Sequence, residues 1–236
     1  MRLVIGNFKM NLDNDEILDY LEFFKNDKYT NVIFAPTFIY LKDFVNYGLS
    51  VASQDVSFAS KGAYTGDVSV NQLKSIGVKY SIVGHSERRK YYNDSKLVND
   101  KVKLLLENSL IPIICIGETK EERESGRTKN ILFKEIDDAF KNIDTNMLNN
   151  VIIAYEPIWS IGTGVVPTNS EIYETIKNIK DYIHNNYHVN LKVLYGGSVN
   201  INCIDDLTEV ENIDGYLVGG CSIKKEEFKE LIKRAS

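Results

Sequence analysis

The sequence predicts a closed barrel of eight parallel strands surrounded by helices, a (β/α)8 barrel, in one domain covering residues 1–236. Three observations lead to this fold class. Short apolar runs recur about eight times, segments with helical spacing separate them, and polar residues or glycines follow the carboxyl ends of most runs. A chain of 236 residues, 43% of them hydrophobic, also suits one large core.

The expected strands are short runs rich in β-branched residues. Runs that are apolar on both faces are typical of parallel strands covered on both sides. In chain order they are LVIGNF (3–8), NVIFAP (31–36), LSVAS (49–53), YSIVGH (80–85), IPIICIG (111–117), VIIAYE (151–156), KVLYGG (192–197) and GYLVGG (215–220).

The expected helices lie between these runs, and their apolar residues recur every three or four positions. Several begin with Asp, Asn, Thr or Ser, whose side chains cap the free N–H groups of a helix start. In chain order, helices are expected at 13–26, 37–47, 94–109, 130–143, 169–186, 202–210 and 222–235, with a further helix start at 86–89.

The alternation of strands and helices also fits an open doubly wound sheet, but the strand ends favour a closed barrel. Asn7 and Lys9 follow the first run, His85 ends the fourth and Glu156 ends the sixth, while glycines end the last two. An open sheet would hold these ends far apart. A barrel brings them round one mouth, where such enzymes place their chemistry.

Composition excludes some functions. The formal charge of −5 argues against non-specific nucleic-acid binding, which needs a basic surface. Three cysteines form neither an even set nor a C-x-x-C pair, so we expect a reducing, cytoplasmic location. The start, MRLVIGNFKMN, becomes polar too soon for a signal peptide or a membrane helix, so no membrane association is expected.

Glu156 stands at the end of an expected buried strand, and Pro157 then fixes the exit of the chain. In an enclosed site its carboxylate would have a raised pKa, which fits a general base. The alternative is a strand-end glutamate that pairs with a lysine.

His85 precedes a helix start whose N–H groups would disfavour protonation of the ring and leave a neutral donor. A buried core histidine is the alternative. His184 and His188 are four positions apart on a helical run, as metal ligands are, but nothing nearby supplies a third ligand. We therefore interpret them as surface residues.

Asn7 and Lys9 point the same way on an extended segment and would together hold a polarised oxygen, unless the strand simply runs into solvent there. YGGS (195–198) and VGG (218–220) end the seventh and eighth runs. Glycines let backbone N–H groups approach a phosphate, and these strands carry the usual phosphate position of the barrel.

Taken together, the motifs resemble those of the triosephosphate isomerase family along essentially the whole chain. The matching stretches are GNFKMN (6–11), GAYTGD (62–67), VGHSERR (83–89), CIGE (115–118), YEPIWSIGTG (155–164), LYGGSV (194–199) and LVGGCS (217–222).

The resemblance implies interconversion of dihydroxyacetone phosphate and D-glyceraldehyde 3-phosphate through an enediolate, in glycolysis and gluconeogenesis. It implies that Glu156 is the base, that neutral His85 donates to the substrate oxygens, and that Lys9 with Asn7 stabilises their charge, with Glu87 orienting Lys9. It implies no metal and no cofactor. The implied phosphate ligands are the N–H groups of Gly162, Ser198, Gly219 and Gly220.

The resemblance also implies a lid over the phosphate, formed by residues 157–168. Pro157 and Trp159 suit a stiff first hinge, and residues 162–164 bring backbone to the phosphate. Two features of this lid depart from the family pattern. The second hinge is Val165-Val166-Pro167, and Ser160 stands where alanine is commoner.

Residues 54–69 form a long polar, glycine-bearing loop, which is typical of a functional or partner-binding segment, although a surface excursion is the alternative. The resemblance implies a homodimer in which this loop enters the other subunit, so that Thr65 reaches the partner subunit's Asn7 and His85. Phe8, Asp55 and Asp67 depart from the common tryptophan, asparagine and glutamate.

The sequence leaves two other functional interpretations open. One is a different phosphosugar barrel enzyme, such as an epimerase or a lyase, although an epimerase would want several metal ligands at strand ends, where only His85 is available. The other is a catalytically silent phosphate-binding barrel that acts as a binding scaffold.

Overall fold

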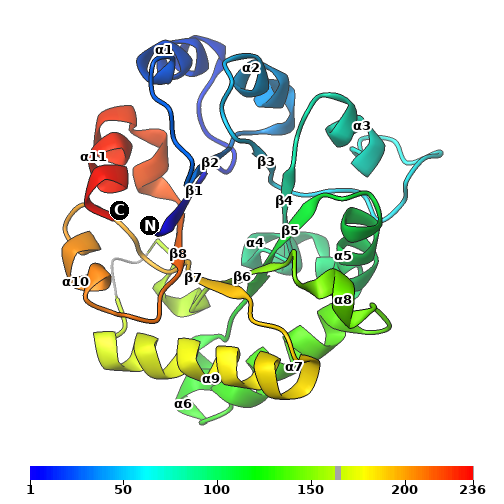
Figure 1. Cartoon of the computed structure of the whole chain (residues 1–236), viewed down its shortest axis with the longest axis vertical. Coiled ribbons are helices and arrows are strands. Elements are labelled where there is room, and N and C mark those ends of the chain that lie inside the picture. Colours follow the sequence, from blue (N-terminus) through cyan, green and yellow to red (C-terminus); the bar gives the residue numbers. More distant parts are fainter. Residues whose placement is uncertain (163–165, 236) are drawn as a thin grey trace.

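A computed structural model describes residues 1–162 and 166–235 of the chain. Its parallel strands form one eight-stranded sheet in the order β2-β1-β8-β7-β6-β5-β4-β3. The sheet closes because Phe34 of β2 forms a parallel bridge with Val51 and donates its N–H to Ser50 O at 2.9 Å. The predicted (β/α)8 barrel is confirmed (Figure 1). The strands are β1 Leu3–Asn7, β2 Val32–Ala35, β3 Ala52–Ser53, β4 Tyr80–Val83, β5 Ile111–Ile116, β6 Ile152–Tyr155, β7 Lys192–Tyr195 and β8 Gly215–Val218.

The helices surround this sheet as an outer layer (Figure 1). Three short ones, α3, α6 and α8, were not predicted. The α-helices are α1 Asn14–Phe24, α2 Leu41–Asn46, α3 Val70–Ser75, α4 Ser86–Tyr92, α5 Val98–Glu107, α6 Lys120–Glu124, α7 Thr128–Phe140, α8 Thr145–Leu148, α9 Asn169–Tyr187, α10 Ile204–Thr208 and α11 Lys225–Ala235. The 3-10 turns are η1 Phe38–Tyr40, η2 Asp94–Lys96, η3 Ile158–Ser160 and η4 Gly220–Ile223.

Side-chain caps fix where several helices begin. Asp13 accepts the N–H groups of Asp15 and Glu16, and the Glu16 side chain accepts the Asp13 N–H in return, which completes a capping box at α1. Thr168 forms the same box with Glu171 at the start of α9. The Thr168 cap matters for the site, because it anchors the chain just after the expected lid.

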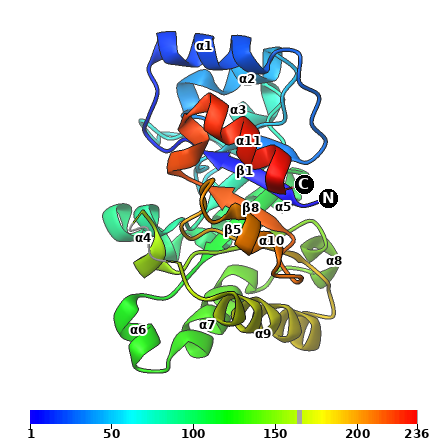
Figure 2. The same ribbon diagram turned by 90° about the vertical axis from the view of Figure 1, so that its left-hand side faces the viewer.

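Alternation along the strands divides the core into two layers. A smaller cluster that includes Ile5, Ile82 and Ala154 fills the barrel, and a larger one packs between the strands and the helices. Because strand side chains alternate, the inner face continues from Ile5 to Asn7 and from Ala154 to Glu156. Figure 2 shows β1 and β8 running towards the side where α4 lies, away from both chain termini. The site lies at these carboxyl ends.

Candidate active site

A pocket of about 410 Å³ opens at the carboxyl ends of the strands. The eight residues that the sequence predicted for catalysis and substrate binding all line it: Asn7, Lys9, His85, Glu156, Gly162, Ser198, Gly219 and Gly220. Glu87 lies beside the pocket, against Lys9. Thr65 is exposed in the 54–69 loop and does not line the pocket.

Glu156 reaches the pocket as the next inward-facing residue after Ala154. Its N–H donates to Ile116 O at 2.8 Å, so β6 stays paired with β5 up to the carboxylate. Glycine is required at position 117 beside it, because a Cβ there would lie 1.8 Å from the Glu156 carbonyl oxygen. The Glu156 side chain is almost fully buried.

His85 reaches the pocket by a different route from the one expected. Strand β4 ends at Val83, so His85 does not end the strand but caps the N-terminus of α4. The turn depends on Gly84, whose φ of +69° is accessible to glycine and strained for other residues. Without this turn, strand alternation would point position 85 away from the barrel interior.

The imidazole and the carboxylate are in direct contact. His85 Nε2 lies 3.1 Å from Glu156 Oε1, and the Ser86 N–H donates to Glu156 Oε2 at 3.4 Å. His85 Nδ1 accepts the Glu87 N–H at 3.2 Å. Because Nδ1 is an acceptor in this contact, the proton of the neutral ring sits on Nε2 and faces Glu156.

The pKa values of this pair differ from the sequence expectation. Burial raises the pKa of Glu156, but His85, Lys9 and the Ser86 N–H lower it by more, so it falls below its usual value. Burial and, to a smaller degree, Lys9 lower the pKa of His85, but the carboxylates of Glu156 and Glu87 together raise it by more. The expectation of a raised pKa for Glu156 is therefore wrong for the free site. The start of α4 was expected to keep the His85 ring neutral, but the Glu156 carboxylate favours its protonated form.

Lys9 is held by its backbone and by its side chain. Its φ of +53° is uncommon for a residue other than glycine, and its N–H donates to Asn7 Oδ1 at 3.1 Å. Lys9 Nζ donates to Glu87 Oε1 at 2.7 Å. Gln54 Nε2 donates to the carbonyls of Lys9 at 2.8 Å and Ala35 at 2.9 Å. Sequence reasoning missed Gln54, although it directly follows the third strand.

Residues that follow the last two strands also line the pocket. Ser198, Gly219 and Gly220 follow β7 and β8, and a Cβ at Gly219 would lie 3.5 Å from Lys9 Cε. The Lys9 ammonium and the backbone amides of these residues are thus within reach of one small anion.

The family model for triosephosphate isomerase matches residues 2–235. The chain belongs to the triosephosphate isomerase family.

Relatives in that family cover the chain almost end to end. A triosephosphate isomerase of Alkaliphilus oremlandii is 39% identical over 242 aligned positions, covering 98% of both chains. One of Mycoplasmopsis pulmonis is 40% identical over 245 positions, covering 98% of this chain and 96% of its own, and one of Mycoplasma genitalium is 38% identical.

A frame of partly buried polar contacts, not found from the sequence, supports His85. Arg89 Nε donates to Gly84 O at 2.6 Å, and its NH2 group donates to Cys115 O at 3.0 Å. The NH1 nitrogen of Arg89 lies 3.4 Å from Glu135 Oε1, and the Glu135 carboxylate accepts the Gly117 N–H at 2.9 Å. Burial raises the pKa of Glu135, with Arg89 and the Gly117 N–H opposing. The frame joins the ends of β4 and β5.

The positions that depart from the triosephosphate isomerase pattern are accommodated locally. Phe8 is buried, with its ring centroid 4.9 Å from that of Tyr20. Asp55 forms an ion pair with buried Lys101 at 2.8 Å, and Asp67 accepts a hydrogen bond from Ser57 Oγ at 2.7 Å within its own loop.

Within the expected lid, Trp159 Nε1 donates to Glu118 Oε1 at 3.1 Å, and Pro167 is buried. Thr163, Gly164 and Val165 lie outside the described residues.

Within residues 1–162 and 166–235, no group of three or more His, Cys, Asp or Glu side chains is placed to hold a metal ion. In that same part of the chain, no helix has both the length and the apolar character needed to cross a membrane.

Proposed function

We propose that this protein interconverts dihydroxyacetone phosphate and D-glyceraldehyde 3-phosphate by proton transfer through an enediolate, as a step of glycolysis and gluconeogenesis. The observation that carries the proposal is the contact of Glu156 with His85 in a pocket that also holds the Lys9 ammonium. A carboxylate base beside N–H donors is what aldose–ketose isomerisation requires.

Glu156 is the base in this proposal. It takes a proton from the carbon next to the carbonyl and returns it to the neighbouring carbon, so one carboxylate serves both steps. Its lowered pKa supports this role, because the side chain is ionised and able to accept a proton at neutral pH.

The oxygens of the enediolate face the donors. His85 presents its Nε2 proton, and Lys9 adds a positive charge that Glu87 holds in place at 2.7 Å. Donors fixed before the reaction stabilise developing negative charge without having to reorganise. Asn7 contributes by fixing the backbone of Lys9 through the 3.1 Å hydrogen bond.

The phosphate is bound by backbone N–H groups of Gly162, Ser198, Gly219 and Gly220. All four residues line the same pocket as Glu156 and His85. Glycine at three of these positions leaves the amides open to a dianion. Residues 157–168 would close over the phosphate and exclude water, which strengthens every electrostatic contact in the site.

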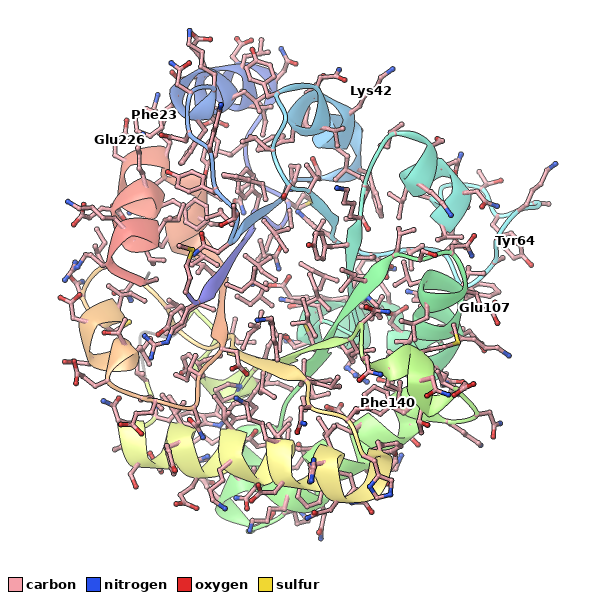
Figure 3. All side chains as sticks on the ribbon, in the orientation of Figure 1. Phe23, Lys42, Tyr64, Glu107, Phe140 and Glu226 are labelled. Carbon is pink, nitrogen blue, oxygen red and sulfur yellow. The ribbon has the colours of Figure 1, made fainter. Side chains whose placement is uncertain are left out.

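We also propose a homodimer through loop 54–69, located in the cytoplasm. The loop projects from the barrel, with Tyr64 at the outer edge of the molecule (Figure 3). Phe58 and Tyr64 pack their rings 5.2 Å apart yet stay partly exposed, as does Ile39 at 76%. Burying such apolar surface favours association, and Thr65 would then reach the partner subunit's Asn7 and His85. The unpaired cysteines fit a reducing compartment.

Light scattering over a range of protein concentrations tests the assembly. We expect the mass of a dimer for the wild type and of a monomer for Tyr64→Asp, which places a charge at the loop tip. A wild type that stays monomeric at every concentration would contradict the dimer.

A coupled assay on D-glyceraldehyde 3-phosphate, with and without a chelator, tests the activity. We expect turnover that the chelator leaves unchanged. Inactivity of the folded protein would point to a silent phosphate-binding scaffold. Activity that the chelator abolishes would point to a metal-dependent phosphosugar enzyme.

A further inference from the structure

Ser160 and Ser198 are joined by two hydrogen bonds. The Ser198 N–H donates to Ser160 Oγ at 3.3 Å, and Ser198 Oγ donates to the Ser160 carbonyl at 2.6 Å. Ser160 is fully buried at the end of η3, and a Cβ built on Gly197 would lie 3.0 Å from its hydroxyl oxygen. The hydroxyl is therefore packed tightly against the loop that follows β7.

The hydrogen bond to Ser160 Oγ uses an N–H group that is proposed to bind the substrate. The N–H of Ser198 is one of the amides proposed to bind phosphate, and in the free protein it points at Ser160 Oγ. An alanine at position 160, the residue commoner in the family, has no side-chain oxygen to accept this N–H. The backbone carbonyl contact does not depend on the side chain at position 160.

We infer that the Ser160 hydroxyl occupies the phosphate-binding amide of Ser198 in the free enzyme and is displaced from it when a phosphorylated ligand binds. Ser160 then sets the phosphate affinity of the site, an inference that rests on the proposed function. A phosphate dianion displaces the Ser160 hydroxyl from the Ser198 N–H because charge-assisted hydrogen bonds are roughly twice as strong as neutral ones. The displaced bond is a cost that phosphate binding must offset.

Ser160→Ala tests the inference. The variant removes the acceptor of the Ser198 N–H together with the contact of the hydroxyl with the Tyr195 phenol, and it should tighten the binding of glycerol 3-phosphate by about two- to fivefold. The matched control is D-glyceraldehyde, which has no phosphate and leaves the Ser198 N–H unused. Any change in its kcat/KM should be smaller than the change in glycerol 3-phosphate binding, whereas a general disturbance of the pocket would change both alike.

The wild type provides an independent test that needs no variant. In a crystal structure with glycerol 3-phosphate, the Ser198 nitrogen should have left Ser160 Oγ and lie about 2.9 Å from a phosphate oxygen. A Ser198–Ser160 hydrogen bond that persists in the complex would overturn the inference, as would unchanged or weaker binding by Ser160→Ala. If the wild type isomerises triose phosphate, the proposed function stands even when one of these two results overturns the inference. A wild type that neither isomerises triose phosphate nor binds glycerol 3-phosphate removes both.

Discussion

The Nε2 atom of His85 lies 3.1 Å from Oε1 of Glu156, although the two residues follow different strands. At this separation no substrate atom fits between them. In the proposed mechanism both groups must instead contact the substrate. Substrate binding is therefore expected to move the carboxylate from the imidazole towards the substrate carbon.

Shortening the base tests its position. Glu156→Asp draws the carboxylate back by one methylene, so we expect kcat to fall by about 100-fold or more, because small misplacements of reacting groups are costly. Binding of glycerol 3-phosphate should stay within about twofold, since the phosphate amides are untouched. Steady-state kinetics and calorimetry measure the two effects. Equal losses in both would discredit Glu156 as the base.

The pKa of His85 depends on its neighbour. The Glu156 charge raises it above 6.5, whereas burial and Lys9 lower it. In Glu156→Gln the raising charge is gone, so the pKa should fall below 6.5. An NMR titration of the ring measures both values, and identical pKa values in the two proteins would contradict the assigned contact.

The same pair sets a pH window for stability. The lowered pKa of Glu156 adds stability above pH 4.5, which is lost as pH falls through the folded value. The raised pKa of His85 adds stability below pH 6.5, which is lost as pH rises through the folded value. The free energy of unfolding should therefore exceed that of Glu156→Gln most clearly between these limits. Denaturant unfolding at a series of pH values checks this, and a pH-independent difference would contradict it.

The Arg89 frame should matter for both stability and turnover. Arg89→Met removes the donors to Gly84 O and Cys115 O and leaves Glu135 without its ion pair. We expect a loss of about 3 kcal/mol in the free energy of unfolding, and a lower kcat because the turn that aims His85 relaxes. Glu135→Gln, which keeps the shape, should lose less of both. Full activity in a folded Arg89→Met would show that the frame does not position His85.

A buried charge cluster that includes Asp55 of the 54–69 loop offers a double-mutant test. Lys101 Nζ lies 2.8 Å from Asp55 and 2.5 Å from Asp94, with all three residues buried. Lys101→Met leaves Asp94 without its cation, whereas Asp55 keeps Arg88 at 2.8 Å, and should cost about 3–5 kcal/mol of stability. Adding Asp94→Asn should recover part of the loss, because the uncompensated charge is removed. Additive losses in urea unfolding would show that the two residues do not interact.

Much of the fold and site follows from local sequence rules. Strand alternation carries Asn7 and Glu156 to the inner face, and capping residues such as Thr168 mark helix starts. These features depend on residues close together in the chain, so a single sequence reveals them. The predicted barrel and family are both confirmed.

The remaining features depend on contacts between distant segments. The pKa directions of Glu156 and His85 follow from a 3.1 Å separation that no local pattern encodes. The support that Arg89 gives to Gly84 and Cys115 likewise appears only once β4 and β5 lie side by side. Sequence reasoning named residues that line one pocket but not the groups that hold them in place.

The most direct test of the account is a crystal structure with a phosphorylated hydroxamate that mimics the enediolate. We expect its two oxygens within about 3 Å of His85 Nε2 and Lys9 Nζ, and its phosphate on the amides of Ser198, Gly219 and Gly220. The Glu156 carboxylate should have left His85 and lie over the carbon mimic. A ligand bound elsewhere, or a Glu156 that stays on His85 in the complex, would contradict the proposal that these groups form one catalytic site.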